Sequence, residues 1–125
     1  MNTLVNLPLV AVVDDDLAIR EALADLINSL GYAGAVFGSA EDFLEFEPRS
    51  AVSCAIVDVN MPGLSGIELQ SRLRREPNCP PMIFVTSHQD DRTRDTALAA
   101  GALAFLGKPV DLGRLIQSIH NALNT

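Results

Sequence analysis

Acidic, hydroxyl and cationic side chains follow four short apolar runs of this sequence, close to the point where each run ends. The runs and the residues that follow them are Leu7–Val13 with Asp14, Asp15 and Asp16; Val52–Val57 with Asp58; Met82–Val85 with Thr86; and Ala102–Leu106 with Lys108-Pro109. If the runs are parallel strands, these side chains lie at one edge of a sheet. Carboxylates gathered there repel one another unless a cation lies between them.

The residue types at this edge indicate which ion and which ligand would suit it. Oxygen ligands without histidine or cysteine select a hard ion such as Mg²⁺, which takes few protein ligands. Lys108 supplies a positive charge and Thr86 a hydroxyl group. An anion with terminal oxygens suits both, and a phosphoryl group is the obvious candidate.

Each of these residues alone has a more ordinary interpretation. Asp16 is best explained as a helix cap, Asp58 before a Pro-Gly loop fits a turn, and a lone lysine is usually a surface charge. His88 fits an exposed loop histidine better than a metal ligand or a phosphorelay histidine. The functional hypothesis therefore depends on the joint pattern of acids, hydroxyl and lysine.

The apolar spacing predicts the elements that must position these side chains. Short β-branched runs alternate with segments whose apolar residues recur every three or four positions. The expected strands are Leu7–Val13, Ala33–Phe37, Val52–Val57, Met82–Val85 and Ala102–Leu106. The expected helices run from Asp16 to Leu30, from Ser39 to before Pro48, from Ser65 through Leu73, from Asp91 to Ala100, and from Asp111 with an apolar face of Leu112, Leu115, Ile116, Ile119 and Leu123.

This alternation predicts an α/β fold with a parallel sheet and helices on both of its faces. In such sheets, ligands bind at the carboxyl ends of the strands, near the point where the strand order reverses. The acidic, hydroxyl and lysine residues fall at those ends. The sequence therefore predicts one functional edge.

Length, composition and charge bound the remaining interpretations. The chain has 125 residues, which predicts one domain spanning 1–125, and its hydrophobic fraction of 48% excludes disorder. Sixteen acidic and nine basic residues give a net charge of −7, which argues against direct nucleic-acid binding.

The sequence also indicates the compartment. No apolar run approaches the ~20 residues of a membrane span, and the N-terminus lacks the basic start of a secretory signal. Two cysteines, Cys54 and Cys79, are too few for a disulfide scaffold, and we expect both to be reduced. These features predict a cytoplasmic protein without a membrane partner.

Four segments resemble the receiver domain of bacterial two-component response regulators: VVDDD, IVDVNMPGLSGIEL, IFVTS and AFLGKPV. The resemblance covers essentially the whole chain, with the motifs in order and at the spacing of that family. It implies a doubly wound, five-stranded (βα)₅ sandwich of flavodoxin-like topology, with strand order 2-1-3-4-5.

The resemblance also implies a role for each acidic residue. Asp58 would be the phosphoacceptor. Asp15 and Asp58 would bind Mg²⁺ through their carboxylates, Asn60 through its backbone carbonyl, and Asp14 would assist through water.

Further roles follow for the residues at the ends of the last two strands. Thr86 and Lys108 would contact the phosphoryl oxygens, and Thr86 with Phe105 would form the conformational switch. The Lys108-Pro109 peptide bond is expected to be cis, because this bond is often cis in receivers and X-Pro is the one kind of bond where cis is cheap.

The implied function is signal reception. A sensor histidine kinase or phosphotransfer protein would phosphorylate Asp58, and the face formed by helix 4, strand 5 and helix 5 would then dock a partner or a second copy. The segment SAEDFLEF, with Phe105, looks most like receivers of nitrogen-fixation and LuxR-type regulators. The chain would then be either a stand-alone receiver or one cut from a longer regulator, in which an output domain that is not in this chain would control transcription.

Two other hypotheses use the same residues. A degenerate receiver would act only as a protein-interaction adaptor, but such proteins usually lack the acceptor Asp or the Lys, and Asp58 and Lys108 are present. An aspartyl-nucleophile phosphatase of the haloacid-dehalogenase type would need a second acid two residues after the nucleophile, where this chain has Asn60. We therefore expect no enzyme activity beyond phosphorylation and dephosphorylation of the chain itself.

Overall fold

The computed structural model describes residues 7–124, and its sheet has five parallel strands. The strands are β1 (Leu9–Val13), β2 (Ala33–Phe37), β3 (Val52–Asp58), β4 (Met82–Thr86) and β5 (Ala104–Gly107), in the order β2-β1-β3-β4-β5. The helices are α1 (Leu17–Ser29), α2 (Ala40–Leu44), α3 (Gly66–Leu73), α4 (Asp91–Ala99) and α5 (Leu112–Leu123), with a 3₁₀ turn, η1, at Arg49–Ala51. The predicted (βα)₅ fold and its strand order are confirmed, whereas the predicted domain bounds, 1–125, include ends outside the described residues.

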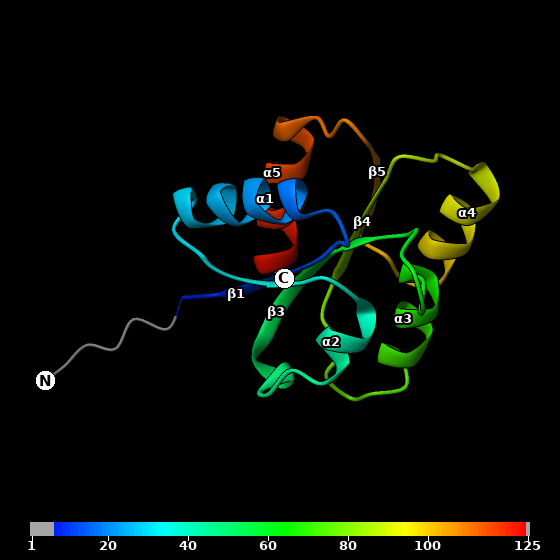
Figure 1. Cartoon of the computed structure of the whole chain (residues 1–125), viewed down its shortest axis with the longest axis horizontal. Coiled ribbons are helices and arrows are strands. Elements are labelled where there is room, and N and C mark those ends of the chain that lie inside the picture. Colours follow the sequence, from blue (N-terminus) through cyan, green and yellow to red (C-terminus); the bar gives the residue numbers. More distant parts are fainter. Residues whose placement is uncertain (1–6, 125) are drawn as a thin grey trace, which may run out of the picture.

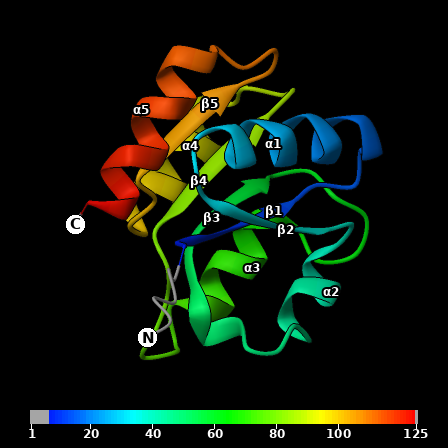
Figure 2. The same cartoon turned by 90° about the vertical axis from the view of Figure 1, so that its left-hand side faces the viewer.

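Helices cover both faces of the sheet (Figures 1 and 2). Helices α1 and α5 pack on one face, where Ile27 and Ile119 are fully buried against the strands. Helices α2, α3 and α4 pack on the other face, with Phe43, Leu69 and Ala97 in that core. Strands β3 and β4 are buried almost throughout, which explains why their sequences are continuous apolar runs.

Two predicted strands start too early. Strand β1 begins at Leu9 rather than Leu7, which is exposed. Strand β5 begins at Ala104 rather than Ala102, because the Ala102 N–H donates to the Ala97 carbonyl and completes the end of α4. Gly101 has a φ of 102°, the left-handed conformation that commonly ends a helix. The apolar residues after Gly101 therefore belong first to a helix end and only then to a strand.

The predicted apolar face of the last helix is wrong at one residue. Leu115 and Ile119 are buried, whereas Leu112 keeps 57% of its surface exposed. Leu112 is the first residue after the cap Asp111, so it starts the helix without packing on the sheet. Helix α2 is also shorter than predicted, since it ends at Leu44.

The helix starts follow the predicted caps. Asp16, Ser39, Ser65 and Asp111 each accept backbone N–H bonds at the start of a helix. Ser65 and Glu68 form a complete capping box. These caps fix the helix starts that follow the carboxyl ends of the strands.

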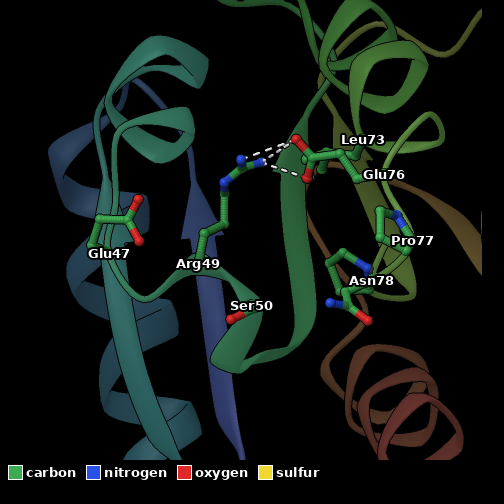
Figure 3. A pocket seen from close by; sticks show the side chains of 8 residues that line it. Glu47, Arg49, Ser50, Leu73, Glu76, Pro77 and Asn78 are labelled. Atoms are coloured by element: carbon green, nitrogen blue, oxygen red, sulfur yellow. Dashed lines mark hydrogen bonds and ion pairs between the residues drawn. The ribbon is translucent and has the colours of Figure 1, made fainter.

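A polar pocket of about 230 Å³ lies at the amino-terminal ends of the strands, between the loops that lead into β3 and β4 (Figure 3). Arg49 Nη1 reaches across it to Glu76 Oε1 at 2.8 Å, in a two-pronged ion pair.

The predicted cis bond at Lys108-Pro109 is present, and Glu47-Pro48 is a second cis bond that we did not predict.

Candidate functional site

Strands β1 and β3 are neighbours in space, and their connections lead to opposite sides of the sheet. The carboxyl ends of these strands bring Asp14, Asp15 and Asp58 together, with one oxygen of each within 4.8 Å of the others. Asp14 and Asp58 are buried at 1% and 6% exposure, while Asp15 is exposed. The predicted acidic cluster is therefore present at the point where the strand order reverses.

Lys108 lies between the two buried carboxylates. Its Nζ donates to Asp14 Oδ2 at 2.9 Å and to Asp58 Oδ2 at 3.3 Å. The Lys108 N–H donates to the Thr86 carbonyl at 2.7 Å, which continues the β4–β5 pairing and directs the residue toward the cluster. A single fixed cation thus bridges two acids that are 44 residues apart in sequence.

Burial and charge act on these groups in opposite directions. Burial, and then repulsion by Asp14, raise the pKa of Asp58 despite the bonds from the Asn60 N–H and Lys108. Burial disfavours the charge of Lys108, yet its pKa is raised, because its bonds to and attraction by Asp14 and Asp58 outweigh burial. The cluster therefore has more negative charge than Lys108 alone balances.

Thr86 ends β4, on the strand next to Asp58, and is fully buried. Its Oγ1 accepts from the His88 N–H at 3.1 Å and donates to the His88 carbonyl at 3.3 Å. It also accepts from Asn60 Nδ2 at 3.4 Å. The Thr86 hydroxyl thus bonds to the loop after β4, through His88, and to the loop after β3, through Asn60, and not to Lys108.

In the loop after β3, the sequence predicted a role only for the backbone carbonyl of Asn60. The backbone N–H and the side chain of Asn60 also form hydrogen bonds at the site. The Asn60 N–H donates to Asp58 Oδ1 at 3.2 Å, so it helps to orient the Asp58 carboxylate. The side-chain bond from Asn60 to Thr86 joins the β3 and β4 loops, and we did not predict it. His88 is exposed in its loop, as expected.

Two further polar contacts support this edge and were also missed. Arg20 Nη1 donates to the Asp14 carbonyl at 2.7 Å, and Glu41 Oε2 accepts from the Leu64 N–H at 3.0 Å. Arg20 lies on α1 and Glu41 lies on α2. Helical periodicity marks their positions only as exposed, so no signal in the sequence identifies their partners.

Phe105 lies on β5, half-buried, with its ring centroid 6.3 Å from that of Phe84. It lines a groove of about 510 Å³ between α4 and α5. The other residues of this groove are Arg94, Leu98, Leu103, Ala104, Leu106, Gly113, Arg114, Gln117 and Ser118. The groove lies on the face of α4, β5 and α5, which is predicted to dock a partner after phosphorylation.

The donor set suits a hard divalent cation. The three clustered side chains offer only carboxylate oxygens, and two of them are buried with incomplete charge balance. Such a ligand set selects ions such as Mg²⁺ over softer metals. The residues therefore fit the predicted ion.

The family model for the response regulator receiver domain matches residues 10–120. The chain belongs to the receiver domain family of response regulators. Members of this family bind Mg²⁺ at an acidic cluster, and Asp14, Asp15 and Asp58 form such a group in this receiver. Receivers take their signal from histidine kinases or phosphotransfer proteins.

Individual relatives agree with this assignment. The receiver is 38% identical over 112 residues to the transcriptional regulatory protein FixJ of Bradyrhizobium diazoefficiens, covering 90% of this chain and 55% of the relative. It is 39% identical to the response regulator protein TodT of Pseudomonas putida, covering 90% of this chain and 49% of the relative. The chain thus spans about half the length of these curated relatives.

The fold agrees with solved receivers as well. The crystal structure of FixJ-N is 34% identical and superposes with a TM-score of 0.82, covering 94% of each chain. No helix within residues 7–124 is long and apolar enough to cross a membrane.

Proposed function

We propose that this chain is a phosphorylatable receiver domain, spanning residues 1–125, in which Asp58 accepts a phosphoryl group from a histidine kinase or phosphotransfer protein. The observation that supports this most is the position of Asp58. Its carboxylate is buried at the carboxyl end of the central strand, accepts a bond from Lys108 Nζ, and has an oxygen within 4.8 Å of carboxylate oxygens of Asp14 and Asp15.

The transfer step forms one bond and breaks one bond. A carboxylate oxygen of Asp58 attacks phosphorus, and the bond to the donor's leaving group breaks, which gives an acyl phosphate on Asp58. Hydrolysis of this acyl phosphate releases inorganic phosphate and restores the carboxylate. Phosphoryl transfer depends mainly on positioning and charge neutralisation, and aspartate suffices as the nucleophile under those conditions.

Four residues would hold the ion required for this step: Asp15 and Asp58 through carboxylates, Asn60 through its carbonyl, and Asp14 through water. The ion, Mg²⁺, would supply positive charge against the phosphoryl oxygens. Lys108 already reaches this site, and its ammonium would pair with a phosphoryl oxygen after Asp58 is modified. The Asn60 N–H orients the attacking carboxylate.

Phosphorylation would act on the rest of the molecule through Thr86. The group adds about −1.5 to −2 charge and three acceptor oxygens. The Thr86 hydroxyl would leave His88 and Asn60 to bond one of these oxygens, and Phe105 would turn into the vacated space. The phosphoryl group need only bind this arrangement better than the alternative one.

The groove beside Phe105 supports the predicted docking face. It lies between α4 and α5 and contains apolar side chains, so its shape would change with the Phe105 ring. We propose that a partner or a second copy of the chain docks there. The similarity to FixJ, a transcriptional regulatory protein, supports control of transcription through an output domain.

Charge and cysteine chemistry support the remaining parts of the proposal. The net charge of −7 argues against direct nucleic-acid binding by this chain. Cys54 and Cys79 are both free thiols, as predicted, which fits a cytoplasmic location. The chain would catalyse only its own phosphorylation and dephosphorylation.

Incubation with acetyl phosphate tests this function. In the presence of Mg²⁺, intact mass spectrometry should show one phosphoryl group per chain, and a chelator should abolish the labelling. A chain that is never labelled would be an adaptor instead. Steady release of phosphate from added phosphate esters, at many turnovers per chain, would indicate a phosphatase.

A further inference from the structure

Helix α2 makes a direct polar contact with the loop that follows the proposed phosphoacceptor. Glu41 lies in the first turn of α2, which Ser39 caps. Its Oε2 accepts the Leu64 N–H at 3.0 Å, across 23 positions of sequence. Leu64 belongs to the β3–α3 loop, residues 59–65, which also contains Asn60.

Gly63, the residue before Leu64, leaves space for the Glu41 carboxylate. Gly63 has a φ of 78°, in the left-handed region that favours glycine. A Cβ atom at Gly63 would lie 2.5 Å from Glu41 Oε2, which is too close for any real contact. Glycine therefore favours the turn and leaves room for the Glu41 carboxylate, which a larger residue would displace.

The charge state of Glu41 agrees with this contact. The Leu64 N–H lowers the pKa of Glu41, helped by its own backbone N–H and by Arg72. The group is accordingly ionised at neutral pH and accepts the bond as a carboxylate. A charged acceptor forms a stronger hydrogen bond than a neutral one.

Other contacts hold the two ends of the loop. The Gly66 N–H donates to the Val59 carbonyl at 2.9 Å, and the Asn60 N–H donates to the Asp58 carboxylate. Met61 is buried in the core. None of these contacts involves Gly63 or Leu64. That part of the loop is held by the bond from the Leu64 N–H to Glu41 on α2.

We propose that Glu41 is a positioning residue for the phosphorylation site. By binding Leu64 it keeps the β3–α3 loop in the conformation that presents the Asn60 carbonyl beside Asp58. This inference rests on the proposed function, because the Asn60 carbonyl matters through the Mg²⁺ that it would bind. It assigns to α2 a part in metal binding, although α2 contributes no ligand.

Calorimetric titration of the unphosphorylated chain with Mg²⁺ tests this inference. Glu41→Ala should weaken Mg²⁺ binding by about fivefold, the size expected for loss of one such hydrogen bond. Glu41→Gln should bind nearly as well as the wild type, because its amide oxygen can still accept the Leu64 N–H. Glu45→Ala is the matched control, since it removes an exposed acidic side chain from the turn that follows α2.

Amide hydrogen exchange at Leu64 gives an independent measurement. We expect faster exchange at Leu64 in Glu41→Ala than in the wild type and in Glu41→Gln, with unchanged exchange in β3. This comparison separates a local change in the loop from a general loss of folding.

The outcomes distinguish the inference from the function on which it rests. A wild-type chain that fails to bind Mg²⁺ contradicts the proposed site itself. If the wild type binds and Glu41→Ala binds equally well, the positioning role is wrong. Equal weakening in Glu41→Ala, Glu41→Gln and Glu45→Ala also overturns it, because the effect would then be one of net charge.

Discussion

The buried carboxylate of Asp58 has a raised pKa, because burial and the neighbouring Asp14 disfavour its charge. Asp14 and Asp58 both face Lys108, and one ammonium group cannot balance two buried carboxylates and the exposed Asp15. A carboxylate whose pKa is raised in the folded state destabilises that state when it is ionised. The acidic site thus lowers the stability of the metal-free chain.

The first prediction concerns Asp58→Asn in a chelating buffer. Since the pKa of Asp58 is raised by burial and by Asp14, its ionised form costs stability at every pH above that raised value. The variant should therefore melt a few degrees above the wild type at neutral pH. The advantage should shrink as the pH falls from the raised value toward the ordinary pKa of an aspartate. Thermal melts at several pH values measure this, and a wild type that is as stable as the variant at neutral pH would contradict it.

The sequence predicted which residues gather at the site but not all of their contacts. Asp14, Asp15, Asp58 and Lys108 could be placed together because strand ends of a parallel sheet share one edge. The bond from Asn60 to Thr86 could not be predicted, since it depends on how two loops fold toward each other. Contacts between loops are set by backbone conformation, which residue spacing does not encode.

At the scale of elements, helix caps fix where each helix begins after its strand. The α3 capping box joins Ser65 and Glu68 at the end of the β3–α3 loop, and Gly66 within it bonds back to Val59. A Cβ at Gly66 would lie 2.5 Å from the Asp58 carbonyl. The start of α3 is thereby packed directly against the end of β3.

The second prediction concerns this cap. Ser65→Ala removes the bond to the Glu68 N–H and should lower the free energy of unfolding by about 1 kcal/mol. Urea denaturation measures the change. Ser71→Ala, at an exposed position within the same helix, is the control and should change stability much less. Equal effects of the two substitutions would show that the cap does not stabilise α3.

The elements show where sequence patterns are sufficient. Apolar runs and apolar periodicity, together with caps and glycines, predicted the order of the five strands and five α-helices within residues 7–124, because burial against a sheet imposes such patterns. They did not predict the 3₁₀ turn η1. The predicted strand start at Ala102 was wrong because that residue completes the end of α4, and the predicted burial of Leu112 was wrong because nothing covers the first residue of α5. Burial at such positions depends on packing in three dimensions.

At the scale of the whole molecule, the proposed metal binding would be linked to folding. Asp14 and Asp15 follow β1 and Asp58 ends β3, so unfolding separates the cluster. A ligand that binds only the folded state at a hundred times its dissociation constant adds about 2.7 kcal/mol of stability. Mg²⁺ should therefore stabilise the intact fold.

The third prediction is a melting experiment with and without Mg²⁺. The melting temperature of the wild type should rise by several degrees in Mg²⁺, and that of Asp15→Asn should rise less. Asp25→Asn changes an exposed acid on α1 and should show the full rise. Equal rises in wild type and Asp15→Asn would count against Asp15 as a ligand.

Identification of the residue that carries the phosphoryl group tests the proposed function most directly. After reaction with acetyl phosphate and Mg²⁺, an acyl phosphate can be trapped by borohydride reduction and located by peptide mass spectrometry. We predict one modified residue, Asp58, with full labelling in Asp25→Asn and none in Asp58→Asn. Labelling that persists in Asp58→Asn, or modification at another residue of the wild type, would contradict it.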